Sequence, residues 1–445
     1  MAKQVHGTVK RSAYVSVLAL GFVTSGALAA DFSIKGNISE TLTGSNNYFL
    51  SNSPSGATYQ TSTGLGLNFL AQTPTTQYLF SGNGSYYKYF GPGAVDTNPT
   101  WGTPASTRFS IDHTTELDRY HLGASWSRVD TATTLLAQTG TLSGHGSTDT
   151  YNVNGAVTHD IGRIDSITLS SSASTASSSD ASFTPYDDVT SALIWNHTLS
   201  PTTALINSVN FDWFSEKNTA NSQRLFWTFM SGLNTQLTRR LTLKGDVGIA
   251  FVNSYQNGSA QPFVPVVPVG AVPFQPLVGA GHSLIWDVGL SYRLLKNTTA
   301  SLNAAQSIIP LLTGQLQKSE TVGLSVFHTI NDYSSLSFST NYAQTTSGQG
   351  VVAASVPQTS VAEFFSASVS YGYQLTRYWH SSLTYAYHQR NDSSGFANAS
   401  VVTFTISRDL NILGNPSAIN AAEQERARLR AQNTVGYVFP AFAPF

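Results

Sequence analysis

Few side chains of this sequence could carry covalent chemistry. The chain has no cysteine, which removes thiolate nucleophiles, thiolate metal ligands and disulfides together. No phosphate-binding glycine loop, helical zinc motif or EF-hand pattern occurs in a fitting context. Serine is so abundant that each histidine lies near one by chance, and no distinctive motif marks a Ser–His–acid triad. The histidines also lack the i, i+2 or i, i+4 clustering of a metal site. We therefore predict no enzyme, no cofactor and no metal.

Charged side chains at alternate positions are the chemistry that remains. In an extended strand, residues two apart face the same side. This parity places one set of charges on a shared polar face: Lys35, Asp112, Asp212, Lys244, Asp246, Asp287, Arg293 and Arg390. In a pore, opposed acids and bases set the charge preference at close range. Cross-strand pairs that fix the register are the structural alternative.

Four of these residues flank the longest interruption in the pattern. Lys244 and Asp246 precede it, and Asp287 and Arg293 follow it, so the two pairs fall on adjacent predicted strands. We predict that they line a constriction, with Asp212 and Arg390 as further pore-lining residues. Because the two signs balance, strong selection of cations or anions is not expected.

The elements that position these charges are long amphipathic strands. Leu243, Val247 and Ile249 share one face of residues 241–251, and Lys244 and Asp246 share the other. The same alternation of large apolar and small polar residues recurs from residue 31 to about residue 409. Each such segment predicts a strand with one apolar and one polar face.

Composition excludes the commoner protein classes. Charged residues make up 11% of the 445 residues, less than half of the roughly 25% of a soluble domain. After the first thirty residues no apolar run reaches the roughly 20 residues of a membrane helix. The net charge of −1 gives no support to nucleic-acid binding.

The pattern of these strands fits a membrane barrel better than a soluble β-sandwich. The strands run about 10 to 14 residues, against the 9 to 11 that cross a bilayer. The polar face is small and neutral, as a watery lumen allows. Aromatic residues recur near strand ends, where interface girdles sit, as at Tyr86, Tyr87 and Tyr89 or at Tyr385 and Tyr387. Because lipid forbids an open sheet edge, the strands must close on themselves.

Short polar turns give the number of strands. They are expected near residues 74, 117, 162, 201, 239, 296, 332 and 376. With a first strand at about 32–48 and a last one at about 396–409, they predict an all-β, transmembrane, antiparallel up-and-down barrel of about eighteen strands. Sixteen is the alternative, because the first and fourth strands are weakly patterned. Both termini then lie on the periplasmic side.

The ends of the chain fall outside this pattern. Residues 1–29 have the basic front, short apolar core and Ala-x-Ala close of a secretory signal peptide. The barrel is expected over residues 30–409, and residues 410–445 form a periplasmic tail with one short helix. Arg426, Arg428 and Arg430 of that helix are candidates for docking a periplasmic partner.

Three further segments are predicted to be loops. Residues 91–104 and 174–185 are rich in glycine and proline or in serine, and are expected outside the membrane. Residues 255–280 are apolar and rich in proline, so they cannot form an inner strand of a sheet. That segment folds inward as a constriction, meets a partner or has no role; the sequence leaves the three open.

The whole chain resembles the uncharacterised outer-membrane β-barrels of Gram-negative proteobacteria, some of which accompany exopolysaccharide export. The resemblance covers residues 31–409 and includes an opening segment, residues 38–47 (ISETLTGSNN), similar to that family's opening. It implies outer-membrane lipid, lipopolysaccharide and the barrel assembly machinery as partners. We expect a passive pore for small hydrophilic solutes. The alternatives are a barrel for exopolysaccharide export or secretion that docks a periplasmic partner, and a closed structural barrel. The oligomeric state, the solute and whether the lumen is open stay undetermined.

Overall fold

A single closed sheet makes up the part of the chain that the computed structural model describes. The described residues are 31–94, 104–130, 146–179, 184–217, 223–255, 279–310, 316–347, 360–392 and 395–414. None of them belongs to a helix long and apolar enough to cross a membrane.

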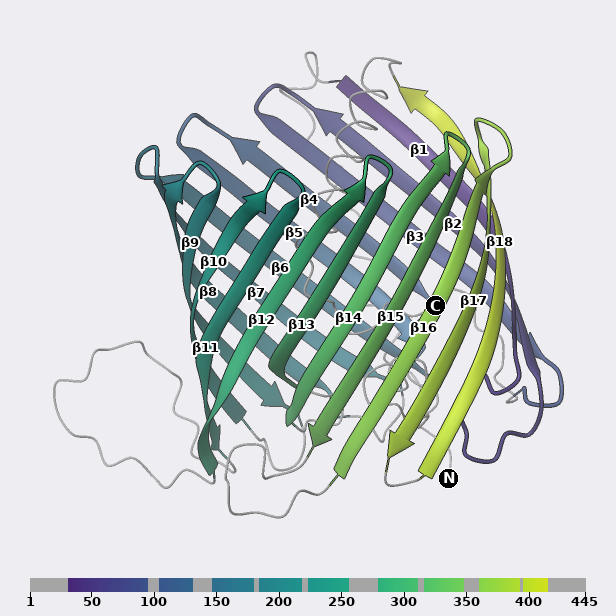
Figure 1. Ribbon diagram of the computed structural model, residues 1–445. Helices are drawn as coiled ribbons and strands as arrows, with labels where there is room; N and C mark the ends of the chain where they lie inside the picture. The colour runs from purple at the N-terminus through teal and green to yellow at the C-terminus, as the bar shows by residue number, and fades with distance from the viewer. Residues whose placement is uncertain are drawn as a thin grey trace, which may run out of the picture.

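Eighteen strands form the sheet, and each pairs antiparallel with its neighbours in sequence (Figure 1). Their bounds are β1 Asp31–Ser45, β2 Thr58–Gln72, β3 Thr76–Phe90, β4 Ala105–Thr114, β5 Asp118–Asp130, β6 Ser147–Asp160, β7 Asp165–Ser178, β8 Tyr186–Ser200, β9 Thr203–Glu216, β10 Gln223–Thr238, β11 Leu241–Tyr255, β12 Gly279–Leu295, β13 Thr298–Pro310, β14 Leu316–Asn331, β15 Ser334–Ser347, β16 Ser360–Gln374, β17 Trp379–Asp392 and β18 Gly395–Gly414.

Pairing of the first strand with the last closes the barrel. β1 pairs with β18 from Ser33 opposite Gly414 to Ser45 opposite Val401, and with β2 along its other edge. Closure leaves no free edge between these strands, which is the arrangement that lipid requires. The prediction of an eighteen-stranded antiparallel barrel is confirmed, and the alternative of sixteen strands is wrong for the described residues.

The period-two pattern divides every strand between two faces. On β11, Val247, Ile249 and Phe251 are 54%, 44% and 43% exposed on the outer face, while Ala250 and Val252 point inward and are buried. The outer faces of other strands carry similar exposed apolar side chains, including Leu65, Val153, Leu169, Leu284 and Leu383. The inner faces carry mainly serine, threonine, asparagine and glycine, together with the charges described below.

The two ends of the barrel differ in their connections. At one end, eight connections of two to four residues join β2–β3, β4–β5, β6–β7, β8–β9, β10–β11, β12–β13, β14–β15 and β16–β17; at the other end the connections are longer, except for the two residues between β17 and β18. The eight short connections lie together at the upper end in Figure 1, and we call this end the turn rim. All eight include positions predicted as turns from the sequence. The opposite end, which the remaining connections join, is the loop rim.

Several predicted boundaries are wrong. The first strand ends at Ser45, not at residue 48, because Tyr48, Phe49 and Leu50 turn inward. Residues 174–178, predicted as loop, belong to β7, because they continue its register with β6, and residues 174–176 also pair with β8. The last strand continues to Gly414, since residues 410–414 still pair with β1.

Other predictions lie outside the described residues. These are the signal peptide at 1–29, most of the proline-rich segment 255–280 and the C-terminal helix. Tyr255 ends β11 and Gly279 begins β12, so only the edges of the proline-rich segment are described.

Candidate functional site

The connection between β1 and β2 folds onto the inner wall at the loop rim. We call residues 46–57 the inner loop. Leu50 is 3% exposed and packs on Ala397 and Ala399 of β18, with Phe364 and Val401 beside them. Ala397 and Ala399 alternate with Phe396 and Val402, which are 53% and 49% exposed on the outer face. The alanines therefore point into the barrel, and the inner loop lies inside its mouth.

Asparagine side chains hold the inner loop in place. The Asn47 amide nitrogen donates to the carbonyl oxygens of Ser51, at 2.8 Å, and Asn398, at 2.9 Å. The Asn47 amide oxygen accepts from the Ser51 backbone nitrogen at 2.9 Å. The Asn46 side chain accepts from the Ser400 backbone nitrogen at 2.8 Å. These bonds tie the loop both to itself and to β18, so the loop is a fixed part of the mouth.

Aromatic rings continue the inner loop along the wall. Tyr48 packs edge-on against Tyr89 of β3 at 5.3 Å between centroids, and Tyr89 packs against Tyr87 at 5.2 Å. Tyr87 is 4% exposed, and its hydroxyl donates to Asp130 at 2.8 Å. The prediction that Tyr87 and Tyr89 belong to an interface girdle is therefore wrong. Their parity directs them inward, where the inner loop covers them.

A buried arginine completes this side of the mouth. Arg390 of β17 is 5% exposed, donates to the Asn52 side chain at 2.8 Å and lies 3.3 Å from the carboxylate of Asp392. Next to it on the inner face, His388 stacks on Phe364 with 6.0 Å between ring centroids. Arg390 thus links β17 to the inner loop.

Carboxylates gather on the wall across the barrel. In the closed order of strands, β10 is half the circumference away from β1. The inner faces of β8 to β12 carry five acids and three bases: Asp188, Asp212, Glu216, Asp246, Asp287, Arg224, Lys244 and Arg293. We call this set the charged wall. Arg224 pairs with Glu216 at 2.8 Å, and Lys244 pairs with Asp246 at 3.2 Å. On this wall the acids exceed the bases by two.

The structure brings together three of the four residues predicted to form a constriction. Asp246 lies directly opposite Asp287 in the β11–β12 register, and Lys244 bridges to Asp246 on the same face. Arg293 also points inward, but it lies near the turn rim opposite Thr299, away from the other three. Parity alone does not give height along the barrel axis, which explains the error for Arg293.

The remaining predicted residues lie in different places. Asp212 is on the charged wall one strand from Asp188, opposite Thr190 in the register. Arg390 faces inward on the other side, in contact with the inner loop. Arg426, Arg428 and Arg430 lie outside the described residues.

The inner loop is the feature that sequence reasoning missed. Its signal was the apolar run Tyr48–Phe49–Leu50 within a stretch of asparagine and serine. Apolar residues in a loop indicate a surface that the loop covers. Their placement on β18 requires barrel closure, because β18 is more than 300 residues away in the chain.

Metal binding has no support among the described residues, where no three His, Asp or Glu side chains converge on a common point.

Comparisons with known proteins give a fold likeness and no family. No model of a known protein family matches the sequence, and no curated protein sequence is significantly similar to it. Among solved structures, OpdO of Pseudomonas aeruginosa has 11% identity and a TM-score of 0.46, over 86% of this chain and 98% of that one. OccAB3 of Acinetobacter baumannii has 12% identity and a TM-score of 0.44, over 85% and 100% of the two chains. The ferric-catecholate import receptor Fiu of E. coli has 10% identity and a TM-score of 0.43, over 84% and 81%. At these values the likeness carries no argument about function.

Proposed function

We propose that this protein is an outer-membrane β-barrel that forms a passive pore for small hydrophilic solutes. The observation that carries the proposal is the division of a closed barrel into an apolar outer face and a polar, charged inner wall. An exposed apolar surface of this extent is unsuited to water and suited to lipid. A barrel of 16 to 18 strands encloses more space than its inward side chains fill, so an aqueous channel is expected.

The mouth of the pore supports a route for small solutes. The inner loop narrows the barrel from β16–β18, and the charged wall faces it from β8–β12. A solute that enters at the loop rim passes between an aromatic, arginine-bearing side and a carboxylate-rich side. Such side chains act on charged and hydrogen-bonding solutes at close range and without covalent chemistry.

Single-channel conductance of the full chain in a planar bilayer tests this proposal. Steady unitary openings from refolded protein are the expected result. A protein that inserts as a folded barrel and yields no openings would reject the pore and favour a closed structural barrel. Removing residues 415–445, which leaves all eighteen strands, separates these cases further: openings that appear only after removal would make the tail a plug.

Export of exopolysaccharide through a docked periplasmic partner is the second proposal. It rests on Arg426, Arg428 and Arg430, and no contact of the described residues favours it. Replacing the three arginines with glutamine and measuring capture of periplasmic proteins tests this docking role separately from conductance.

A further inference from the structure

Four histidines at the turn rim share one arrangement on the outer face. Each lies at the end of an even-numbered strand and directly opposite a threonine or aspartate of the preceding strand. The ring Nδ1 is hydrogen-bonded to that partner in every case. The pairs are His113 with Thr76 at 2.8 Å, His159 with Asp118 at 2.7 Å, His197 with Asp165 at 2.8 Å and His328 with Thr298 at 2.8 Å.

These rings lie where the apolar outer face ends. On β6, Val153 and Val157 are 56% and 42% exposed, and His159 follows them on the same face. On β8, Leu193 and Trp195 precede His197, and the Trp195 ring nitrogen donates to the same aspartate that holds His197. Tryptophan and histidine, with an apolar body and a polar tip, suit the boundary between hydrocarbon and head groups.

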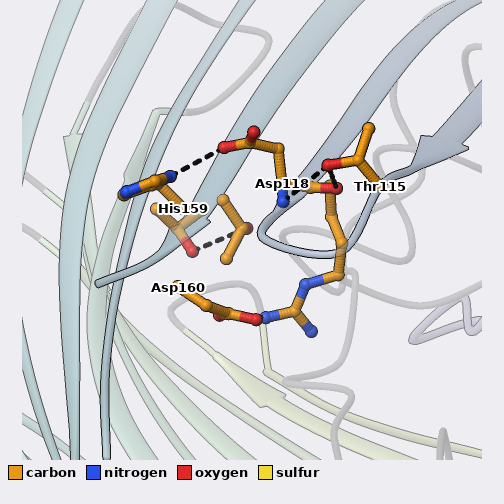
Figure 2. Close-up of polar contacts among 7 residues, drawn as sticks. Thr115, Asp118, His159 and Asp160 are labelled. Carbon is orange, nitrogen blue, oxygen red and sulfur yellow. Dashed lines mark hydrogen bonds and ion pairs between the residues drawn. The ribbon is translucent and has the colours of Figure 1, made fainter. Parts of the chain in front are cut away.

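The hydrogen bond at Nδ1 fixes which ring atom remains for a ligand. Figure 2 shows the His159 ring joined to Asp118, whose backbone is in turn held by Thr115. With Nδ1 engaged, Nε2 is the remaining polar atom of each ring. Beside a carboxylate, as at His159 and His197, Nε2 donates when the ring is protonated. Beside a threonine hydroxyl, as at His113 and His328, Nε2 donates in the neutral ring in the tautomer whose Nδ1 accepts the hydrogen bond.

The turns of the turn rim are both cationic and apolar. Over all eight turns the exposed bases are Arg163, Arg239, Arg240, Lys296 and Arg377, against the acids Glu116 and Asp332. Of these bases Arg163 follows a histidine strand, β6, and the others lie in the turns after β10, β12 and β16. The same turns expose large apolar side chains, among them Leu117, Ile161, Ile164, Tyr333 and Leu375, each 49% exposed or more. Exposed leucine and isoleucine next to arginine suit a phospholipid interface better than open water or a soluble anion.

We propose that the turn rim is a binding surface for anionic phospholipid head groups, with His113, His159, His197 and His328 as ligands for the lipid phosphate. The turn arginines and lysine add charge complementarity. This inference rests on the membrane placement in the proposed function, and it adds a lipid class and a side of the barrel. The occupant is the phosphodiester of a lipid, because the apolar side chains around each histidine require a partner with acyl chains.

Lipid selectivity of the inserted full chain tests the proposal. The barrel is reconstituted in phosphatidylcholine vesicles with spin-labelled phosphatidylglycerol or spin-labelled phosphatidylcholine, and the motionally restricted fraction gives the relative association of the two lipids. A preference for phosphatidylglycerol of about twofold or more is expected. The variant with His113, His159, His197 and His328 all replaced by glutamine is expected to lose at least half of that preference.

A matched control comes from a histidine of the inner face. His121 forms the same kind of pair with Asp112, at 2.6 Å, but points into the barrel. His121→Gln is expected to keep the full lipid preference. The shift in gel mobility on heating shows whether the variant with all four histidines replaced is folded. If that variant is folded and keeps the lipid preference of the natural chain, the proposal is overturned.

Two further outcomes distinguish this inference from the pore. Equal association of both lipids with a conducting barrel would reject the head-group site and leave the pore in place. A lipid preference in a barrel that conducts nothing would reject the pore and leave the site. Loss of the preference on adding millimolar inorganic phosphate would assign the rim to a free anion and overturn the lipid as occupant.

Discussion

Arg390 shows how a charge is accommodated inside the mouth. Its side chain is 5% exposed, and the carboxylate of Asp392 and the Asn52 amide oxygen lie within 3.3 Å and 2.8 Å of it. Taking a guanidinium out of water is costly unless acceptors surround it. The pair therefore fixes the position of β17 relative to the inner loop.

Replacing Arg390 with alanine is expected to destabilise the folded barrel by about 3 to 5 kcal/mol, because the Asp392 carboxylate stays buried without the cation that faces it. Urea-dependent unfolding in vesicles, followed by tryptophan fluorescence, measures the loss. The double variant Arg390→Met with Asp392→Leu is expected to recover most of it. If Arg390→Ala is as stable as the natural chain, the pair of Arg390 and Asp392 does not contribute to the free energy of unfolding.

Lys244 and Asp287 carry opposite charges on the inner wall, so they are expected to change the ratio of cation to anion permeability in opposite directions. Lys244 bridges Asp246, and Asp287 lies opposite Asp246 in the register. Asp287→Asn is expected to lower the permeability ratio of K⁺ to Cl⁻ about twofold, and Lys244→Met to raise it by a similar factor, since charges screened by water are worth up to about 1 kcal/mol.

Reversal potentials under a salt gradient measure both changes, at low ionic strength where screening is weakest. Lys318→Met is the matched control, because Lys318 pairs with Glu320 on the outer face. Shifts of the same sign for Asp287→Asn and Lys244→Met would contradict the placement of these residues on the conducting path.

At the scale of elements, the inner loop is held by few but specific contacts. Leu50 has a φ of +48°, a conformation that costs a leucine energy and persists where the surroundings fix it. The surroundings here are Ala397 and Ala399 under the side chain and the three hydrogen bonds of Asn47. The loop is therefore a packed element on the inner wall, although it contains no helix or strand.

Asn47→Ala is expected to release the inner loop and to raise the unitary conductance. Each lost hydrogen bond is worth on the order of 1 kcal/mol, and the strain at Leu50 favours release. Asn398→Ala is the matched control, because Asn398 contributes its backbone carbonyl and keeps it in the variant. An unchanged conductance together with faster proteolysis at the loop would show that the loop moves without bounding the path.

At the scale of the whole molecule, the pairing of β1 with β18 closes the sheet into a barrel. Thirteen residue pairs join the two strands, and Thr41 bonds to Thr405 at 3.1 Å across the seam. Without this seam, two strand edges would face lipid with unsatisfied backbone groups.

A chain that ends at residue 414 is expected to fold and insert, because it keeps all eighteen strands. A chain that ends at residue 394 lacks β18 and is expected to fail. Resistance of the folded form to detergent at room temperature, lost on boiling, reports the outcome on a gel. A folded, inserted barrel from the shorter chain would disprove the requirement for the β1–β18 seam.

The amino-acid sequence by itself indicated the antiparallel strands, a number of about eighteen and the inner face of the charged residues. Side chains alternate with a period of two whatever the strand pairs with, so parity placed Lys244, Asp246, Asp287 and Arg390 on the inner face correctly. The turns could also be predicted from local sequence, because short polar connections are recognisable from a few residues.

Only the tertiary structure decided which inward residues meet. Heights along the axis depend on register and strand tilt, so Arg293 proved to lie apart from Asp287, and Asp287 to lie against Asp246. The inner loop and the aromatic rings beneath it depend on β18 arriving beside β1, an event that no local pattern encodes. The cross-strand partners that orient His159 and His197 likewise follow from the pairing of whole strands. Local patterns act through the chain's own periodicity, whereas contacts between distant residues exist only once the sheet has closed.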